Sequence, residues 1–295
     1  ISPAALATMT EKTKVANITG CSDFAAMTAR VDNKFYDWAV KNGTVSLTNS
    51  LWTTGEIDES IFASGKGTAE EPYIIAKEKQ LRDFAGSLND KIDYTNKFVA
   101  LGDDITLSSD EWKPVGRSDY LFNGTFDGQG HTVSGMTLGS AEKPFALDKE
   151  NLYIGFFGVL GPQSVVKKLN LTDVAFYTTF GATAYVGGIA GVMQGSRTNN
   201  NFTGAVIDGC SVSGNLSLKG DKGNQFVGGI AGMQYKGAVI NSVAKVDASG
   251  VVLAGDLAEV GGLVGLNNRG LVANCRSDST IYGSGSRENM HHPRR

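Results

Sequence analysis

The amino-acid sequence predicts an all-β protein, a parallel β-helix in which short strands from successive repeats lie side by side. Two observations carry this prediction. A pattern of the type VGGIAG recurs with a period of 33 residues, and each period holds three short strand candidates separated by Gly, Asn, Asp or Ser. Such a unit cannot bury its own apolar face, whereas stacking on similar neighbours does. Helical repeats of similar period are excluded, because Gly-Gly pairs and β-branched residues oppose helix formation.

The repeats are defined by their glycines. The pattern occurs as YIGFFG, VGGIAG, VGGIAG and VGGLVG, with matching glycines at Gly155, Gly188, Gly229 and Gly262. The intervals are 33, 41 and 33 residues, and the long one contains the polar stretch 196–201. This stretch predicts an insertion of about eight residues into a loop. The glycines favour either close packing on both faces or a bend, and the pattern alone fits both.

A second landmark follows each copy of the pattern. Cys210, Ser242 and Cys275 occupy matching places before the next polar strand. Neighbouring strands lie about 4.8 Å apart, so the two cysteines, which are two repeats apart, are beyond disulfide reach. We therefore expect a ladder of small buried side chains at this position.

The chain is expected to divide into four segments. Leu81, Phe84, Ala85 and Leu88 form one apolar stripe at helical spacing, which predicts a short helix that caps the exposed end of the strand stack. The predicted segments are a helical leader or remnant of a preceding domain at 1–50, a joint and the capping helix at 51–93, the parallel β-helix at 94–285 and a tail at 286–295.

The helical leader rests on a second apolar face. Its members are spaced as on one side of a helix, with Ser22 or Asp23 as the N-cap and the stretch from Asn42 to Thr44 as the end. The residues of this face are Phe24, Met27, Val31, Phe35 and Trp38.

Several ordered motifs resemble those of the GLUG-motif proteins, a family of bacterial cell-surface and secreted proteins. The resemblance covers roughly 52–285 and includes the VGGIAG repeats and Asn274-Cys275. The other matching motifs are WTTG at 52–55, GTAEEPYII at 67–75, Gln80-Leu81, WKPVG at 112–116 and FNGTFDGQGHTV at 122–133. The resemblance implies a right-handed parallel β-helix, export, and membership of a larger surface protein. It implies adhesion or carbohydrate contact only loosely, and it extends to proteins that carry protease domains, although HExxH is absent here.

Composition excludes several classes of function. The 295 residues carry 27 Lys and Arg against 30 Asp and Glu, a balance that disfavours nucleic acid as a partner. No run of about 18 apolar residues is present, so no membrane span is expected. Three cysteines are too few for a disulfide-stapled scaffold.

The candidates for catalysis are Asp104, Asp127 and His131. Parallel β-helices often carry polysaccharide lyases and glycoside hydrolases, which need paired carboxylates or a base with Ca²⁺-bound uronate. Asp127 lies in a predicted turn, where Asp is expected for backbone reasons, and His131 is expected to hydrogen-bond a neighbouring repeat. We expect no metal and no cofactor, with Ca²⁺ as the alternative.

Aromatic residues between 153 and 185 are able to form a sugar-stacking face. The group comprises Tyr153, Phe156, Phe157, Phe176, Tyr177, Phe180 and Tyr185. Phe176, Tyr177 and Phe180 precede a repeat and are the candidates for an exposed binding strip, which would mark a binding surface. The alternative is that they fill the irregular first repeat.

These observations favour a non-enzymatic, extracellular or bacterial cell-surface module. Its expected partners are a glycan or a host or matrix protein. An enzyme that degrades polysaccharide and a purely structural stalk remain alternatives. No closing helix or apolar run follows Tyr282. The sequence is therefore consistent with further repeats in a longer protein, or with end-to-end self-association through the last repeat.

Overall fold

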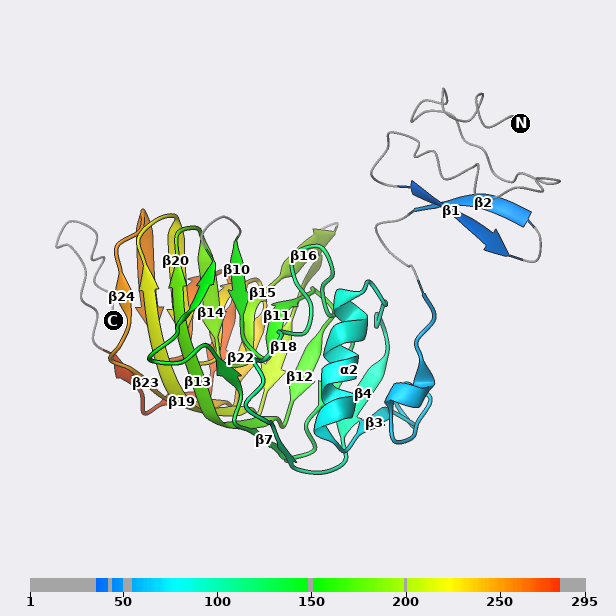
Figure 1. Cartoon of the computed structure of the whole chain (residues 1–295), viewed down its shortest axis with the longest axis horizontal. Coiled ribbons are helices and arrows are strands. Elements are labelled where there is room, and N and C mark those ends of the chain that lie inside the picture. Colours follow the sequence, from blue (N-terminus) through cyan, green and yellow to red (C-terminus); the bar gives the residue numbers. More distant parts are fainter. Residues whose placement is uncertain (1–35, 42–43, 50–54, 148–150, 199–200, 282–295) are drawn as a thin grey trace, which may run out of the picture. The chain divides into compact units, whose positions relative to one another are not determined.

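The computed structural model describes residues 36–41, 44–49, 55–147, 151–198 and 201–281. The chain separates into two compact units, Ile1–Glu56 and Ile57–Arg295. Apart from one α-helix and a 3-10 turn, η2 (Glu59–Ile61), the regular elements described in the second unit are strands, most of them in four parallel sheets (Figure 1). The all-β prediction is confirmed, and successive repeats pair in parallel.

Two of the sheets run through most of the second unit. The seven-stranded sheet contains β3 (Tyr73–Ile75), β4 (Phe98–Leu101), β6 (Thr125–Asp127), β12 (Val165–Lys167), β18 (Val206–Asp208), β22 (Ala238–Ile240) and β27 (Leu271–Ala273). The ten-stranded sheet contains β5 (Ile105–Thr106), β7 (Thr132–Ser134), β8 (Thr137–Leu138), β9 (Phe145–Leu147), β13 (Asn170–Phe180), β19 (Ser211–Gly220), β23 (Val243–Ala248), β24 (Val252–Leu253), β28 (Arg276–Ser277) and β29 (Thr280–Ile281). Parallel pairing begins at β3, within the segment that the sequence assigned to the joint and cap.

The other two sheets have four strands each. The β10 sheet has the order β10 (Leu152–Ile154), β14 (Ala184–Gly187), β20 (Asn224–Gly228) and β25 (Leu257–Gly261). The β11 sheet has the order β11 (Phe157–Leu160), β15 (Ala190–Met193), β21 (Ala231–Tyr235) and β26 (Val264–Asn268).

The glycine pattern forms two short strands rather than one. In the second copy, β14 ends at Gly187 and β15 begins at Ala190, so the chain turns between them. A Cβ on Gly187 would lie against the Ala190 carbonyl and 2.7 Å from the Ile230 carbonyl oxygen. The matching glycines are in register, because the Gly188 amide donates to the Gly229 carbonyl at 3.1 Å. The glycines thus serve both expected purposes, a bend and close packing.

The long interval between repeats contains a β-hairpin. The strands β16 (Gly195–Thr198) and β17 (Asn201–Gly204) pair antiparallel, and the Ala205 amide donates to the Gln194 carbonyl at 3.0 Å, which closes the base of the hairpin. The predicted insertion is therefore present, and the parallel register resumes at β18.

The capping helix is also present. The helix α2 (Glu78–Asn89) buries the predicted stripe of Leu81, Phe84, Ala85 and Leu88. It lies beside β3 and β4 (Figure 1). Phe84 contacts three aromatic rings of the early repeats, with centroid separations of 5.0 Å to Tyr94, 6.0 Å to Phe122 and 6.1 Å to Phe126.

The predicted helical leader is wrong where the structure describes it. Trp38 belongs to β1 (Tyr36–Lys41), which pairs antiparallel with β2 (Thr44–Asn49). The other members of the proposed helical face, from Phe24 to Phe35, lie outside the described residues. Alternating aromatic and β-branched residues on both sides of Asn42-Gly43 are typical of a β-hairpin rather than of a helix end.

Candidate functional site

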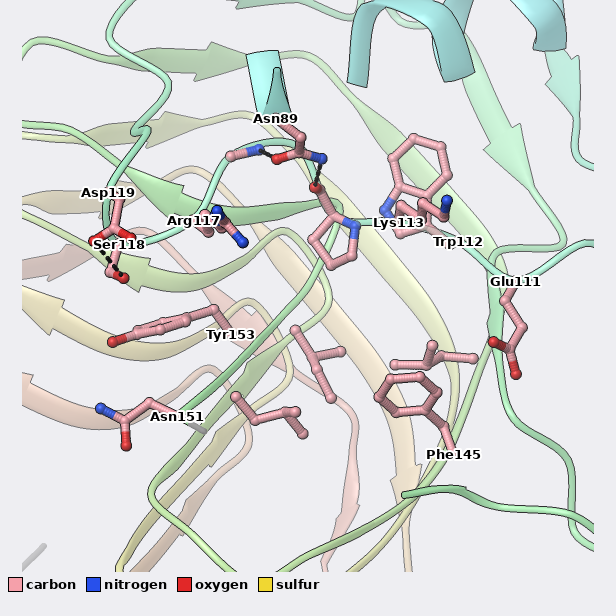
Figure 2. Close-up of a pocket in the computed structure, with 15 residues that line it drawn as sticks. Asn89, Glu111, Trp112, Lys113, Arg117, Ser118, Asp119, Phe145, Asn151 and Tyr153 are labelled. Carbon is pink, nitrogen blue, oxygen red and sulfur yellow. Dashed lines mark hydrogen bonds between the residues drawn. The ribbon is translucent and has the colours of Figure 1, made fainter. Parts of the chain in front are cut away.

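A pocket of about 750 Å³ lies between β10 and the loop formed by residues 111–119. Its lining includes all three residues of β10, Leu152, Tyr153 and Ile154. Figure 2 shows Arg117, Ser118 and Asp119 at one end of the pocket and Glu111 and Phe145 at the other. This volume is within the usual range of about 300–1,000 Å³ for ligand pockets.

The pocket exists because one repeat omits a strand. The early repeat between β5 and β6 contributes no strand to the β10 sheet among the described residues, so β10 is an edge of that sheet. In contrast, the neighbouring strand β11 is covered by the same repeat, through parallel bridges from Val115 to Phe157 and from Phe122 to Leu160. The gap is thus confined to β10.

Helix α2 is hydrogen-bonded to residues 108–111, which lead into the loop beside β10. The Arg82 guanidinium donates to the carbonyls of Asp110 and Glu111 at 3.0 and 3.2 Å, and Glu78 accepts from the amide and hydroxyl of Ser108 at 2.9 and 2.7 Å. The Ser108 hydroxyl, with Arg82, holds the pKa of Glu78 below its usual range. These bonds tie residues 108–111 to the helix.

Trp112, which follows this segment, packs its side chain into the core. Its ring is buried and stacks on Phe156 with a centroid separation of 5.1 Å, and its indole N–H donates to the Gly155 carbonyl at 3.1 Å. Its backbone amide donates to the Thr137 carbonyl at 2.8 Å. The side chain therefore closes the core behind the pocket and ties the loop to the ten-stranded sheet.

The rim of the pocket is polar and carries both signs of charge. The exposed residues include Glu111, Asp119, Lys113 and Arg117. Asn89 at the end of α2 fixes the loop, since it donates to the Pro114 carbonyl at 3.0 Å and accepts from the Gly116 amide at 3.2 Å. The rim therefore carries no strong net charge.

A row of stacked aromatic rings begins in the pocket. Tyr153 stacks on Tyr185 of the next repeat with centroids 5.4 Å apart and planes at 8°, and Tyr185 stacks on Phe226 at 5.5 Å. Burial raises the pKa of Tyr185, with a smaller contribution from Tyr153. Tyr153 is half-buried and is the member of this row that lines the pocket.

The predicted binding strip is wrong for two of its three residues. Phe176 and Phe180 are buried in the core, while Tyr177 is half-buried and lies on the opposite parity of β13. The reason is a β-bulge between Leu171 and Val174 that shifts the register of β13 and reverses which residues face inward. The pocket instead uses Tyr153, which the sequence included only in its wider aromatic group.

The three catalytic candidates occupy two separate places. The Asp104 carboxylate accepts from the Thr132 amide at 2.8 Å and lies 3.2 Å from Nδ1 of His131. These two contacts hold the pKa of Asp104 below its usual range. Asp127 instead pairs with Lys167 at 3.0 Å and accepts from the Gln129 amide at 2.9 Å. None of the three lines the pocket.

The small side chains of successive repeats lie next to one another, as expected, but only Cys210 and Ser242 are buried and Cys275 is half-buried. The Cys210 amide donates to the Ser242 hydroxyl at 3.1 Å, and the Ser242 amide lies 3.5 Å from the Cys275 sulfur. Both cysteines are free, and burial raises the pKa of the Cys210 thiol to about 12. Within the described ranges, no three His, Cys, Asp or Glu side chains gather into a metal site. No helix in that part of the chain is long and apolar enough to cross a membrane.

Comparison with known proteins finds two similarities. No protein-family model matches the chain. A protein of Evansella cellulosilytica named "Putative Gly-rich membrane protein" is 30% identical over 164 residues, which are 54% of this chain and 16% of that protein. The crystal structure of a "putative immunoglobulin A1 protease" from Bacteroides ovatus aligns with a TM-score of 0.42 and 19% identity, over 80% of this chain and 84% of that one. The matched part of the chain thus spans about a sixth of the length of this relative.

Proposed function

We propose that the chain is a non-enzymatic binding module of a bacterial surface or secreted protein, built as a right-handed parallel β-helix of the GLUG type. The four parallel sheets and their common register support the β-helix. The similarity to a much longer protein named as a membrane protein supports a place at the cell surface. The pocket beside β10 is its binding site.

The observation that carries this proposal is the combination of an apolar floor, a ring and a polar rim in one pocket. Leu152 and Ile154 line the pocket at the edge of the buried core, Tyr153 supplies a ring at the end of a stacked row, and the loop supplies hydrogen-bonding groups. A concave, mostly apolar site with a few polar groups is the usual form of a binding pocket. A glycan and an extended polypeptide both suit this chemistry.

An array of glycans and matrix proteins, probed with the whole chain, tests the proposal. The expected result is capture of one class of partner, weakened at least about tenfold by Tyr153→Ala or Arg117→Glu. Lys245→Glu is the matched charge control, because Lys245 is exposed on β23. If Tyr177→Ala abolishes binding while Tyr153→Ala and Arg117→Glu do not, the binding site lies on the ten-stranded sheet instead of in the pocket. Binding to no partner in the array would contradict the proposal and favour a structural stalk.

A polysaccharide-degrading enzyme is the second candidate, because Glu111 and Asp119 both line the pocket. Glycoside hydrolysis uses two carboxyl groups on either side of the scissile bond. Incubation of the chain with polysaccharides, with and without Ca²⁺, distinguishes the two. Depolymerisation that is abolished by Glu111→Gln and by Asp119→Asn would establish the enzyme and overturn the non-enzymatic module.

A further inference from the structure

The edge of β10 that faces the pocket carries main-chain groups for which the described part of the chain supplies no strand partner. The Leu152 amide donates to the Thr183 carbonyl at 2.9 Å, on the side of β14. In a parallel pair, alternate residues of a strand direct their N–H and C=O groups to opposite sides. Tyr153 therefore directs both groups away from β14 and toward the pocket, and no described main-chain group bonds to either.

The next repeat shows how that edge is filled when a strand is present. In the pairing of β10 with β14, Leu152, Tyr153 and Ile154 are in register with Ala184, Tyr185 and Val186. The main-chain groups of Tyr185 consequently point at β10, as those of Tyr153 point at the pocket. The vacant position beside β10 thus has the backbone geometry that the sheet repeats at each later step.

From this geometry we infer that the pocket accepts an extended polypeptide segment, which adds to β10 as a parallel strand. The inference rests on the proposed function, since it names the partner class of the same pocket. Open strand edges pair with extended chains, in which main-chain hydrogen bonds give affinity and alternate side chains give specificity. Loop 111–119 leaves this edge open, whereas it covers the edge of β11.

The register defines the sequence that the segment needs. We designate as p1, p2 and p3 the residues that align with Leu152, Tyr153 and Ile154. The Tyr153 amide donates to the p1 carbonyl, and the Tyr153 carbonyl accepts from the p3 amide. The p2 side chain extends the ring row over Tyr153, as Tyr185 does on the other side, so an aromatic residue is favoured there.

The flanking residues p1 and p3 face the core side, where Leu152 and Ile154 are buried. Small or apolar side chains suit these positions. The rim carries two acidic and two basic residues, so the segment requires no net charge. The strands of the β10 sheet itself have this pattern, for example Ala184-Tyr185-Val186. A peptide with the sequence of residues 181–188, GATAYVGG, is therefore the probe.

Two N-methylated peptides test the main-chain contacts. N-methylation of the valine at p3 blocks the bond to the Tyr153 carbonyl, whereas N-methylation of the tyrosine at p2 modifies an amide that points away from β10. Titration calorimetry with the full chain is expected to detect binding of the unmodified peptide. We expect p3 methylation to weaken it about tenfold or more and p2 methylation to change it much less. Equal effects of the two methyl groups would contradict the strand addition.

Variants of Tyr153 test the same bond from the protein side. Tyr153→Ala removes the ring and keeps the amide, and Tyr153→Pro removes both. Proline is tolerated at an edge strand where the amide is not used by the sheet, and Leu152 before it is already extended. We expect weaker peptide binding for Ala and none for Pro, with circular dichroism unchanged. If both bind alike, the amide is not used and the inference is wrong.

The array and the peptide titration together distinguish failure of the strand addition from failure of the proposed function. If the array finds a glycan whose capture depends on Tyr153 and Arg117 while the peptide does not bind, the pocket is a binding site and the strand addition is wrong. If neither the peptide nor any partner binds, the proposed function itself fails. Binding of the peptide with the predicted methylation pattern supports both.

Discussion

The late repeats, from β14 to β27, and the early repeats, from β3 to β11, build the same sheets in different ways. In the late repeats, outside the β16–β17 hairpin, the strands of successive repeats pair in matching register, and glycines allow the backbones to approach closely. The early repeats rely on large aromatic rings, one helix and a loop that omits a strand. The regular part thus builds the scaffold, whereas the candidate site lies where the repeat is interrupted.

Truncation of Trp112 is expected to have the largest effect on the early repeats. The ring is buried and holds both the Phe156 stack and the bond to Gly155. Trp112→Ala should cost about 3–5 kcal/mol of unfolding free energy, measured by urea denaturation, and Trp112→Phe should cost less because a ring remains. A loss of unfolding free energy below about 1 kcal/mol for the alanine variant would mean that this side chain does not stabilise the early repeats.

One glycine of the late repeats and the glycine of α2 should respond oppositely to alanine. In the late repeats, Gly187→Ala forces a methyl group against main-chain atoms of Ala190 and Ile230 and should cost about 1–3 kcal/mol. In α2, a Cβ on Gly86 meets nothing within 4 Å, so Gly86→Ala should stabilise by about 0.5–1 kcal/mol. Both are measured by thermal or urea unfolding. Equal signs would contradict the assignment of close packing to Gly187 and of open space to Gly86.

High pH should act on the early repeats through Tyr94. Burial raises the pKa of Tyr94 to about 12 from an ordinary value of 10.0, and its hydroxyl lies 2.8 Å from that of Ser87. Between these values the unfolded chain has lost the proton that the folded chain keeps. Stability therefore falls as pH rises from 10 to 12, by up to about 2 kcal/mol. Tyr94→Phe should reduce this loss in pH-dependent denaturation, and an unchanged pH profile would assign the loss to other groups.

One turn position allows a smaller test, which compares the late repeats with the repeat of β12 that precedes them. Lys168, Gly209, Asn241 and Asn274 occupy the same place in successive repeats, and all have positive φ, between 51° and 62°. Lysine is disfavoured there, whereas asparagine tolerates it. Lys168→Asn should stabilise the chain by up to about 1 kcal/mol in thermal unfolding. Asn241→Lys is the reciprocal variant and should destabilise it, since Asn241 also donates to Asp208 at 2.8 Å.

The repeated part of the fold could be predicted from sequence because its determinants are periodic. The matching glycines, the position of the hairpin insertion and the apolar stripe of α2 each follow from local spacing alone. The division of VGGIAG into two strands could not be predicted, since a Gly-Gly pair permits both a bend and a straight strand.

The site could not be predicted because it depends on contacts between distant residues. The segment beside β10 is bonded to α2 through Arg82 and the carbonyls of Asp110 and Glu111, and the local sequence of neither segment predicts that pairing. The orientation of Phe176 depends on one bulge, which reverses the inward and outward faces of the strand. Asp104 and His131 were both candidates, but only the stacking of β5 on β7 brings them together.

Amide hydrogen exchange at Tyr153 and Tyr185 tests most directly whether a strand is missing beside β10. The two tyrosines are in register, and both amides point in the same direction within the β10 sheet. The Tyr185 amide faces β10, whereas the Tyr153 amide faces the open pocket. We predict that Tyr153 exchanges at least about a hundredfold faster than Tyr185 and becomes protected when the GATAYVGG peptide is added. Equal protection of the two amides in the free chain would mean that the edge is already filled, and would contradict this account of the site.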